Sequence, residues 1–149
     1  MPAEFRKLGI AFQYPDNWSL DESDAIKGRQ SVTVYSPNGA FWSVGIHPRW
    51  AVPEQLASAA VEAMREEYKE LEVDETTEEL ANQEISGFDI SFYYLDLINT
   101  AAIRCVSTDE AVYTVFCQAE DREFDRLHLV FQAITVSLLN AIRGEHGIK

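Results

Sequence analysis

Apolar and polar residues alternate along the first third of the chain, a pattern typical of half-buried β-strands. The predicted strands cover residues 10–14, 18–20, 31–35 and 41–47. Turns are expected at Pro15–Asp16–Asn17 and at Pro37–Asn38–Gly39, since these residue types favour tight reversals. Residues 21–29 are polar and contain Gly28, so a loop is expected there. Short reversals between strands predict antiparallel pairing.

A helical period replaces the alternation after Pro53, a residue suited to the first turn of a helix. Its apolar stripe advances by three or four residues, through Ala57, Val61, Met64, Tyr68 and Leu71. The stripe lasts only about two heptads, so packing on a sheet is favoured over a coiled coil. The acidic stretch 72–84 has weak strand character, and Gly87 is expected to close a turn.

Strands return over residues 88–94, 98–107 and 112–119, the last two as a hairpin. A second helix is predicted over 123–142. Its apolar stripe, widened almost all the way round, comprises Phe124, Leu127, Leu129, Val130, Phe131, Ile134, Val136, Leu138 and Leu139. Such a helix is expected to be heavily buried. The order strands, helix, strands, helix predicts one α+β domain over residues 1–149, with two long helices packed on a mainly antiparallel sheet.

Charge narrows the classes of partner. The chain of 149 residues has a formal net charge of −13. This balance disfavours nucleic acids and anionic membranes, which are bound through lysine and arginine. It suits a partner with a basic surface, although solubility alone also explains it. The sequence has no run of 18 apolar residues, so no membrane insertion is predicted. Its polar start lacks the apolar stretch of a secretory signal, so a cytoplasmic location is expected.

The two cysteines fall on the two strands of the predicted hairpin. If Asp109 and Glu110 form the turn, Cys105 lies opposite Thr114 and Cys117 lies opposite Ala102. The two thiols then point to opposite faces of the sheet, because side chains alternate with a period of two. The spacing therefore predicts free thiols rather than a disulfide, which suits a reducing compartment.

The residues that carry chemistry are scattered. The chain has no HExxH or CxxC pattern, no Gly-x-Ser-x-Gly elbow and no glycine-rich phosphate loop. Its paired carboxylates look like solvated charge, without the spacing of a calcium loop. We therefore expect a protein that is not an enzyme and that uses no metal or cofactor.

Aromatic residues on the second face of the strands, or in loops, are the remaining candidates: Tyr35, Phe41, Trp50, Tyr93 and Tyr113. If helices cover both faces of the sheet, these residues belong to the core. If one face is exposed, they form a binding surface. Trp50 is the strongest candidate because it follows His47, Pro48 and Arg49 in a turn, where burial is less assured. The predicted partner-binding residues are Trp50, Arg49, His47, Tyr35 and Phe41.

Two short motifs, at residues 12–18 and 131–138, resemble patterns of the PsbP-like fold family. The opening Phe12-Gln13-Tyr14-Pro15-Asp16-Asn17-Trp18 is similar to its F-x-YP-x-x-W pattern. The helix segment Phe131-Gln132-Ala133-Ile134-Thr135-Val136-Ser137-Leu138 is similar to its closing F-x-x-I-x-x-S-L. That superfamily also contains a nuclear import factor that binds the Ran GTPase, and small bacterial proteins of unassigned role. The resemblance implies an α/β/α layered sandwich and a non-catalytic binding or adaptor role; no binding residue is transferred from it.

Three hypotheses for function follow. The first is a cytoplasmic domain that binds another protein, with a homo-oligomer as one form of this. The second is a cytoplasmic chaperone for secreted effectors, since such chaperones look broadly similar in size and class. The third is a small-ligand binder or enzyme with a pocket near His47, Arg49 and Trp50. A pocket with convergent polar groups favours the third, and an aromatic patch favours the first.

Overall fold

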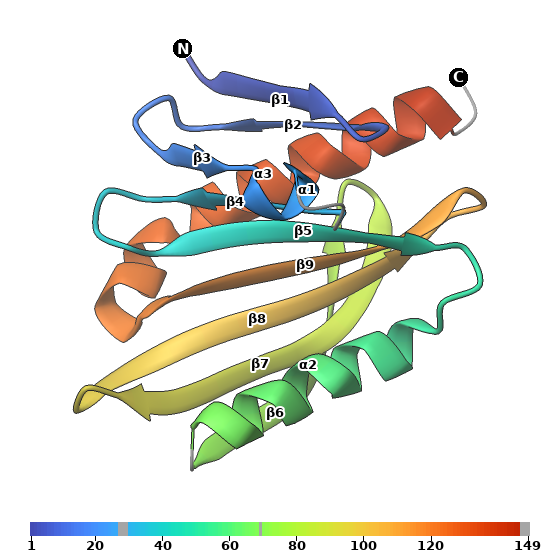
Figure 1. The fold of residues 1–149 in the computed structure, drawn as a ribbon. Coiled ribbons are helices and arrows are strands. Elements are labelled where there is room, and N and C mark those ends of the chain that lie inside the picture. The colour runs from blue at the N-terminus through green and yellow to red at the C-terminus, as the bar shows by residue number, and fades with distance from the viewer. Residues whose placement is uncertain (27–29, 69, 147–149) are drawn as a thin grey trace.

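The computed structural model, which describes residues 1–26, 30–68 and 70–146, is an α+β sandwich around one antiparallel sheet (Figure 1). The seven strands of the sheet lie in the order β3 (Ser19–Asp21), β4 (Ser31–Tyr35), β5 (Phe41–Pro48), β9 (Ala111–Glu120), β8 (Leu97–Ser107), β7 (Gln83–Tyr94) and β6 (Leu71–Leu80). A separate hairpin consists of β1 (Ala3–Lys7) and β2 (Ile10–Tyr14). The helices are α1 (Ser23–Ile26), α2 (Pro53–Glu67) and α3 (Asp121–His146).

The sheet consists of two runs of strands in which each strand pairs with its neighbour in the chain. One run is β3–β4–β5 and the other is β6–β7–β8–β9. They meet along a seam between β5 and β9, where Trp42 pairs with Cys117 and Val44 with Val115. The seam therefore joins the first third of the chain to the last third at the centre of the sheet.

One face of the sheet is covered by α3 together with the β1–β2 hairpin (Figure 1). Trp42 is fully buried there, and its indole nitrogen donates a 2.9 Å hydrogen bond to the Thr135 hydroxyl of α3. The ring of Phe12, from β2, lies 4.8 Å from the Trp42 ring. Trp42 therefore fixes both covering elements to the seam.

The opposite face is covered only in part. The buried side of α2 (Ala57, Val61 and Met64) packs on Ile90, Phe92 and Ile103 of β7 and β8. The short α1 contacts β4 at the other end of this face. Between α1 and α2, no helix formed by the described residues covers the middle of the sheet (Figure 1). The second helical layer is thus complete over β7 and β8, whereas α1 only touches β4 and α2 only reaches the near side of β9.

Hairpin turns connect most strands, as predicted. The Pro37–Asn38–Gly39 turn is closed by a 3.1 Å bond from the Gly39 amide to the Ser36 carbonyl. The β8–β9 turn places Cys105 opposite Thr114 and Cys117 opposite Ala102, which confirms the predicted register. The two thiols therefore lie on opposite faces of the sheet, as the spacing indicated.

Several boundaries differ from the prediction. The segment 21–29, expected to be a loop, contains the single-turn helix α1, and residues 27–29 lie outside the described residues. The strand Ala3–Lys7 was not predicted. Helix α2 ends at Glu67, because Leu71 already begins β6, an edge strand formed by most of the acidic stretch.

The prediction for Gly87 was wrong. The turn that precedes it falls at Ala81 and Asn82, which both have positive φ angles (52° and 62°), as type I′ hairpin turns require. Gly87 lies inside β7, where a Cβ atom would stand 1.7 Å from the Ile103 carbonyl oxygen. The glycine therefore permits a close approach between β7 and β8.

Helix α3 is less buried than its pattern predicted. Phe131, Ile134 and Leu138 are buried against the sheet, but Leu129 is 73% exposed. By length and composition, Asp121–Gly144 is apolar enough to cross a membrane, a property that core helices of soluble proteins share. In this structure, the apolar side of the helix that contains Phe131 serves the core of the sandwich.

Candidate functional site

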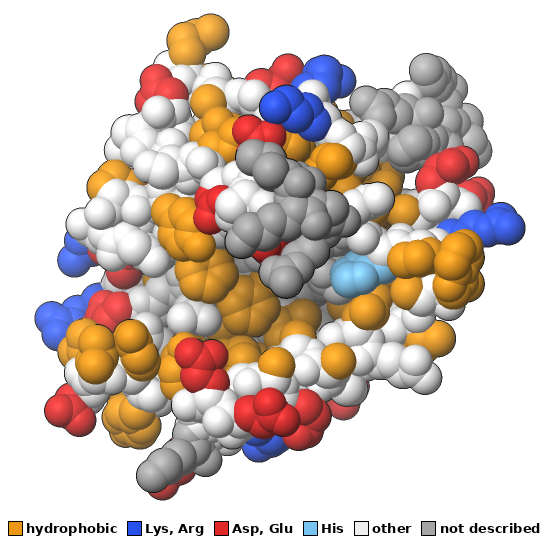
Figure 2. Space-filling view, in the orientation of Figure 1, with side chains coloured by type: hydrophobic (Ala, Val, Ile, Leu, Met, Phe, Trp, Pro, Cys, Tyr) orange, Lys and Arg blue, Asp and Glu red, His pale blue; other side chains and the backbone are white. Residues whose placement is uncertain are grey.

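The uncovered part of the sheet carries a row of aromatic rings, Tyr35, Phe41 and Phe116, which we call the aromatic band. The Tyr35 and Phe41 rings lie 5.8 Å apart, and the Phe41 and Phe116 rings are stacked with centroids 5.7 Å apart. Tyr35 is 39% exposed and the two phenylalanines are half-buried. Figure 2 shows hydrophobic side chains gathered over the middle of this face, above α2. The band is therefore an apolar surface that the fold leaves open.

Strand alternation explains why these rings point away from α3. On β5, Trp42 and Val44 face α3, so Phe41 and Ser43 face the opposite side. Tyr35 lies directly opposite Phe41, and Phe116 lies opposite Ser43 in the β5–β9 register. Three strands thus contribute one ring each to a single surface.

His47 lies further along β5, on the same face. Its Nε2 atom is 3.1 Å from the Thr114 hydroxyl of β9. Gly45 makes room for this contact, since a Cβ atom there would lie 2.8 Å from the Thr114 hydroxyl oxygen and 3.2 Å from His47 Nε2. Burial lowers the pKa of His47 below its ordinary value of 6.5, so the ring is neutral at neutral pH. A neutral imidazole bonded to a hydroxyl is a polar contact point at this end of the face.

Arg49 and Trp50 follow in the connection between β5 and α2. A 2.9 Å bond from the Ala51 amide to the Pro48 carbonyl closes this turn. Both side chains are exposed, Trp50 to 79%. An indole that the core does not use is available for contact with a partner.

The five predicted binding residues therefore fall into two groups on one side of the molecule. Tyr35 and Phe41 touch each other in the band, whereas His47, Arg49 and Trp50 lie at the other end of β5. Phe41 and His47 are separated along the strand by roughly 20 Å, at about 3.3 Å per residue. An elongated surface fits this arrangement better than a single pocket centred on His47.

Carboxylates border the band on its α2 side. Glu62, Glu66 and Glu67 are exposed on this helix, and Figure 2 shows acidic atoms along it, below the apolar surface. Of these, Glu62 is paired with Arg65 at 3.5 Å. The surface next to the aromatic rings therefore carries excess negative charge, which attracts cationic groups.

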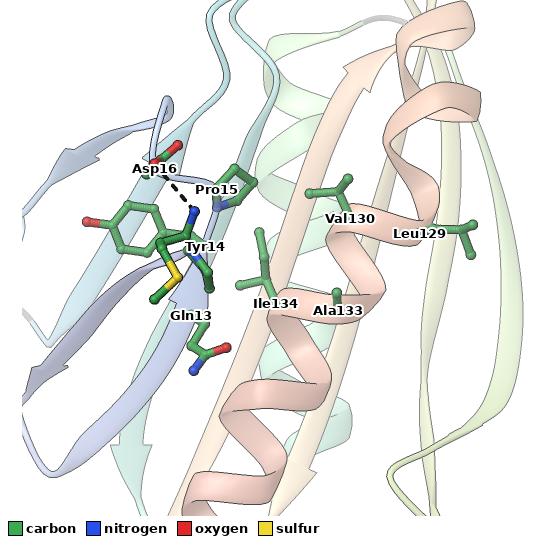
Figure 3. A pocket seen from close by; sticks show the side chains of 10 residues that line it. Gln13, Tyr14, Pro15, Asp16, Leu129, Val130, Ala133 and Ile134 are labelled. Carbon is green, nitrogen blue, oxygen red and sulfur yellow. Dashed lines mark ion pairs between the residues drawn. The ribbon is translucent and has the colours of Figure 1, made fainter.

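A cavity of about 570 Å³ lies on the other side of the molecule, between α3 and the end of β2 (Figure 3). Val130 and Ile134 point toward Pro15, while Leu129 points away, as Figure 3 shows. The Met1 amino group, 4.0 Å from the Asp16 carboxylate, closes one side. Its walls are mostly apolar and bring no set of polar groups together, so the cavity does not suggest a catalytic centre.

Sequence reasoning missed Phe116 and misjudged Tyr113. Phe116 sits in a strand with apolar residues on both faces, so it looked like ordinary core. Tyr113, considered as a possible surface aromatic, is 2% exposed and packs in the core under α3. Within residues 1–26, 30–68 and 70–146, no three histidine, cysteine or acidic side chains are placed to hold a metal ion.

No protein-family model and no curated protein sequence matches this chain. Solved structures do. The cyanobacterial PsbP protein (CyanoP) of Synechocystis sp. PCC 6803 matches with a TM-score of 0.61 and 11% identity, over 91% of this chain and 90% of that one. The Ran-binding protein Mog1p of Saccharomyces cerevisiae matches with a TM-score of 0.56 and 10% identity, over 97% and 94%.

A Pseudomonas aeruginosa protein of unknown function also matches, with a TM-score of 0.57 and 9% identity over 92% of this chain and 95% of that one. These likenesses confirm the PsbP-like fold that the opening and closing motifs indicated. At such low identity they establish the fold alone, so function has to be inferred from the candidate site.

Proposed function

We propose that this protein is a non-catalytic binding domain that holds another protein against the aromatic band. The observation that carries the proposal is the contact series Tyr35–Phe41–Phe116 on a sheet face without a covering helix. Aromatic side chains are over-represented at protein interfaces, where they contribute large contact area at low entropic cost. The Ran-binding activity of Mog1p, on the same fold, supports a protein as the ligand.

The partner presents a basic surface. The band borders the acidic side of α2, and the whole chain has a net charge of −13. Opposite charge raises the association rate and disfavours acidic competitors. A second copy of this chain has the same charge, so repulsion opposes self-association through this face.

Trp50 anchors the far end of the contact. Because it is 79% exposed, its removal leaves the core intact. Tryptophan is among the residues whose truncation most often reduces affinity by about 2 kcal/mol or more. Its turn follows the end of β5, so Trp50 lies beyond His47 at the opposite end of the strand from Phe41.

Site-specific cross-linking tests the proposal. A photoreactive benzoyl-phenylalanine replaces Phe41, and a control protein carries it at Leu129, which is exposed on α3. In lysate of the source cells, we expect one discrete protein adduct from position 41, suppressed by excess unlabelled wild type, and none from position 129. Equal labelling at the two positions, or an adduct with a second copy of this chain, would contradict the proposal.

The captured partner then allows affinities to be measured by calorimetry. We expect Trp50→Ala to weaken binding by about 2 kcal/mol with an unchanged melting temperature, while Leu129→Ala leaves binding unchanged. If neither Trp50→Ala nor Phe41→Ala changes the affinity, the binding surface lies elsewhere.

A further inference from the structure

A second aromatic cluster lies at the C-terminal end of α2. A cavity of about 450 Å³ is lined there by Tyr68, Tyr93, Tyr94, Leu95, Glu67 and Glu70. Tyr68 caps α2, and Tyr93 and Tyr94 end β7 at its turn into β8. Figure 2 shows hydrophobic side chains gathered at this turn, beyond the end of α2. Tyr93 and Tyr94 are 62% and 49% exposed, so neither ring is buried in the core.

The rings are held in a fixed arrangement. Tyr68 and Tyr94 lie with centroids 5.8 Å apart and planes at 85°, so they form two walls at right angles. Tyr68 also packs on Phe92, with ring centroids 4.4 Å apart. Its backbone amide donates a 2.8 Å bond to the Met64 carbonyl. The inner wall is therefore organised before any ligand arrives.

The electrostatics of the cavity favour a cation. Aromatic faces are regions of negative potential, and the carboxylates of Glu67 and Glu70 stand beside them. Burial, with Glu67 adding to it, raises the pKa of the Tyr68 hydroxyl, so Tyr68 stays neutral and acts as an aromatic wall.

The cavity lies near the aromatic band, because Tyr68 and Phe116 both pack against the hydrophobic cluster under α2. Gln118, whose side chain lies beside the Tyr68 hydroxyl, is directly opposite Phe41 in the β5–β9 register. A partner protein bound to the band can therefore place a neighbouring side chain in the cavity beside Tyr68.

We propose that this cavity binds the guanidinium group of an arginine side chain from the partner protein. A guanidinium is planar, so it stacks on one tyrosine ring while its N–H donors reach the carboxylates of Glu67 and Glu70. This inference rests on the proposed function, because it names the chemistry by which the partner is recognised. It adds a specific subsite that the partner fills with a positive charge.

The test uses a free probe and needs no partner. Wild-type protein with ¹³C-labelled tyrosine is titrated with Nα-acetyl-arginine amide and, separately, with the neutral citrulline analogue. We expect saturable shifts of the Tyr68 and Tyr94 ring signals with the arginine probe only. The Tyr35 signal, which reports on the band, should not move.

Two variants locate the binding. Tyr94→Leu removes one wall at an exposed position, and the double change Glu67→Gln with Glu70→Gln removes the charge but keeps the shape. Each should weaken binding of the arginine probe roughly tenfold. Equal shifts with citrulline, or unchanged affinity in both variants, would overturn the proposal.

The two proposals fail separately. Cross-linking from position 41 without arginine binding would leave the aromatic band as the interface and remove this subsite. Saturable arginine binding without that cross-link would leave a cation site and refute the proposed docking surface.

Discussion

Gly87 offers the sharpest test of how the sheet is built. A Cβ atom at this position would stand 1.7 Å from the carbonyl oxygen of Ile103 and 3.1 Å from Cα of Arg104. Ordinary van der Waals contact begins at 3.4 Å, twice the distance available here. In Gly87→Ala, the β7 and β8 backbones must therefore move apart to make room for the methyl group. Both obstacles are backbone atoms, so no side-chain rotation relieves the clash.

The expected loss of stability follows from what must break. Overpacking a core position typically costs about 1–3 kcal/mol. Separating the strands here also stretches hydrogen bonds around the Gly87–Arg104 pair, at about 1 kcal/mol each. Gly87→Ala should therefore lower the free energy of unfolding by at least about 3 kcal/mol, a large fraction of the roughly 5–15 kcal/mol typical of domains.

Urea unfolding followed by circular dichroism measures this loss, with Gly144→Ala as the matched control. Gly144 lies in α3 with nothing within 4 Å of an added Cβ atom. Because alanine is the better helix former, that variant should be as stable as wild type or more stable, by up to about 1 kcal/mol. A loss below about 1 kcal/mol in Gly87→Ala would show that the strands can separate freely and would refute the argument.

Three further outcomes are expected. Phe131→Ala should cost about 3–5 kcal/mol in urea unfolding, because the ring is 3% exposed and packs 6.0 Å from Trp18; a loss below about 1 kcal/mol would place α3 outside the core. Burial lowers the pKa of His47 below 6.5, so as the pH falls through 6.5 toward the folded value the unfolded chain takes up its proton first. Stability should therefore be full above pH 6.5 and decline below it, and melting curves should show that His47→Gln lacks this part of the decline. Burial raises the pKa of Cys105 to about 11 and that of Cys117 to about 12, so both thiols should react slowly with Ellman's reagent in the native protein and fully after denaturation; an intact mass lower by two hydrogens would instead indicate a disulfide.

Much of the fold could be predicted because local patterns and long-range packing agree. Trp42 and Val44 alternate with smaller residues, and the short turn at Asp109 and Glu110 fixed the register of Cys105. The strand Ala3–Lys7 was missed because Phe5 is its only large buried side chain. Gly87 was misjudged because a glycine that permits close backbone approach looks, in sequence, the same as one that forms a turn.

The site could be predicted only in part. Tyr35, Phe41 and Trp50 were recognised because alternation or a turn set them apart from the core. The position of a helix over a sheet depends on tertiary packing. The local sequence pattern therefore does not predict that α2 stops short of β5. Tyr68 looked like one more member of the apolar stripe, although its position at the end of α2 turns its ring toward Tyr94.

The seam between β5 and β9 has a consequence for how the protein reaches its folded state. Hairpins within each run of strands close short loops and form in about 1–10 μs. Pairing Pro48 with Ala111 instead closes a loop of about sixty residues. The chain must lose the conformational entropy of this loop before the contacts of the seam can stabilise it. The transition state is therefore expected to contain Trp42 and Cys117 already paired across the seam. Substitutions there should slow folding, whereas substitutions in the β6–β7 hairpin should mainly accelerate unfolding.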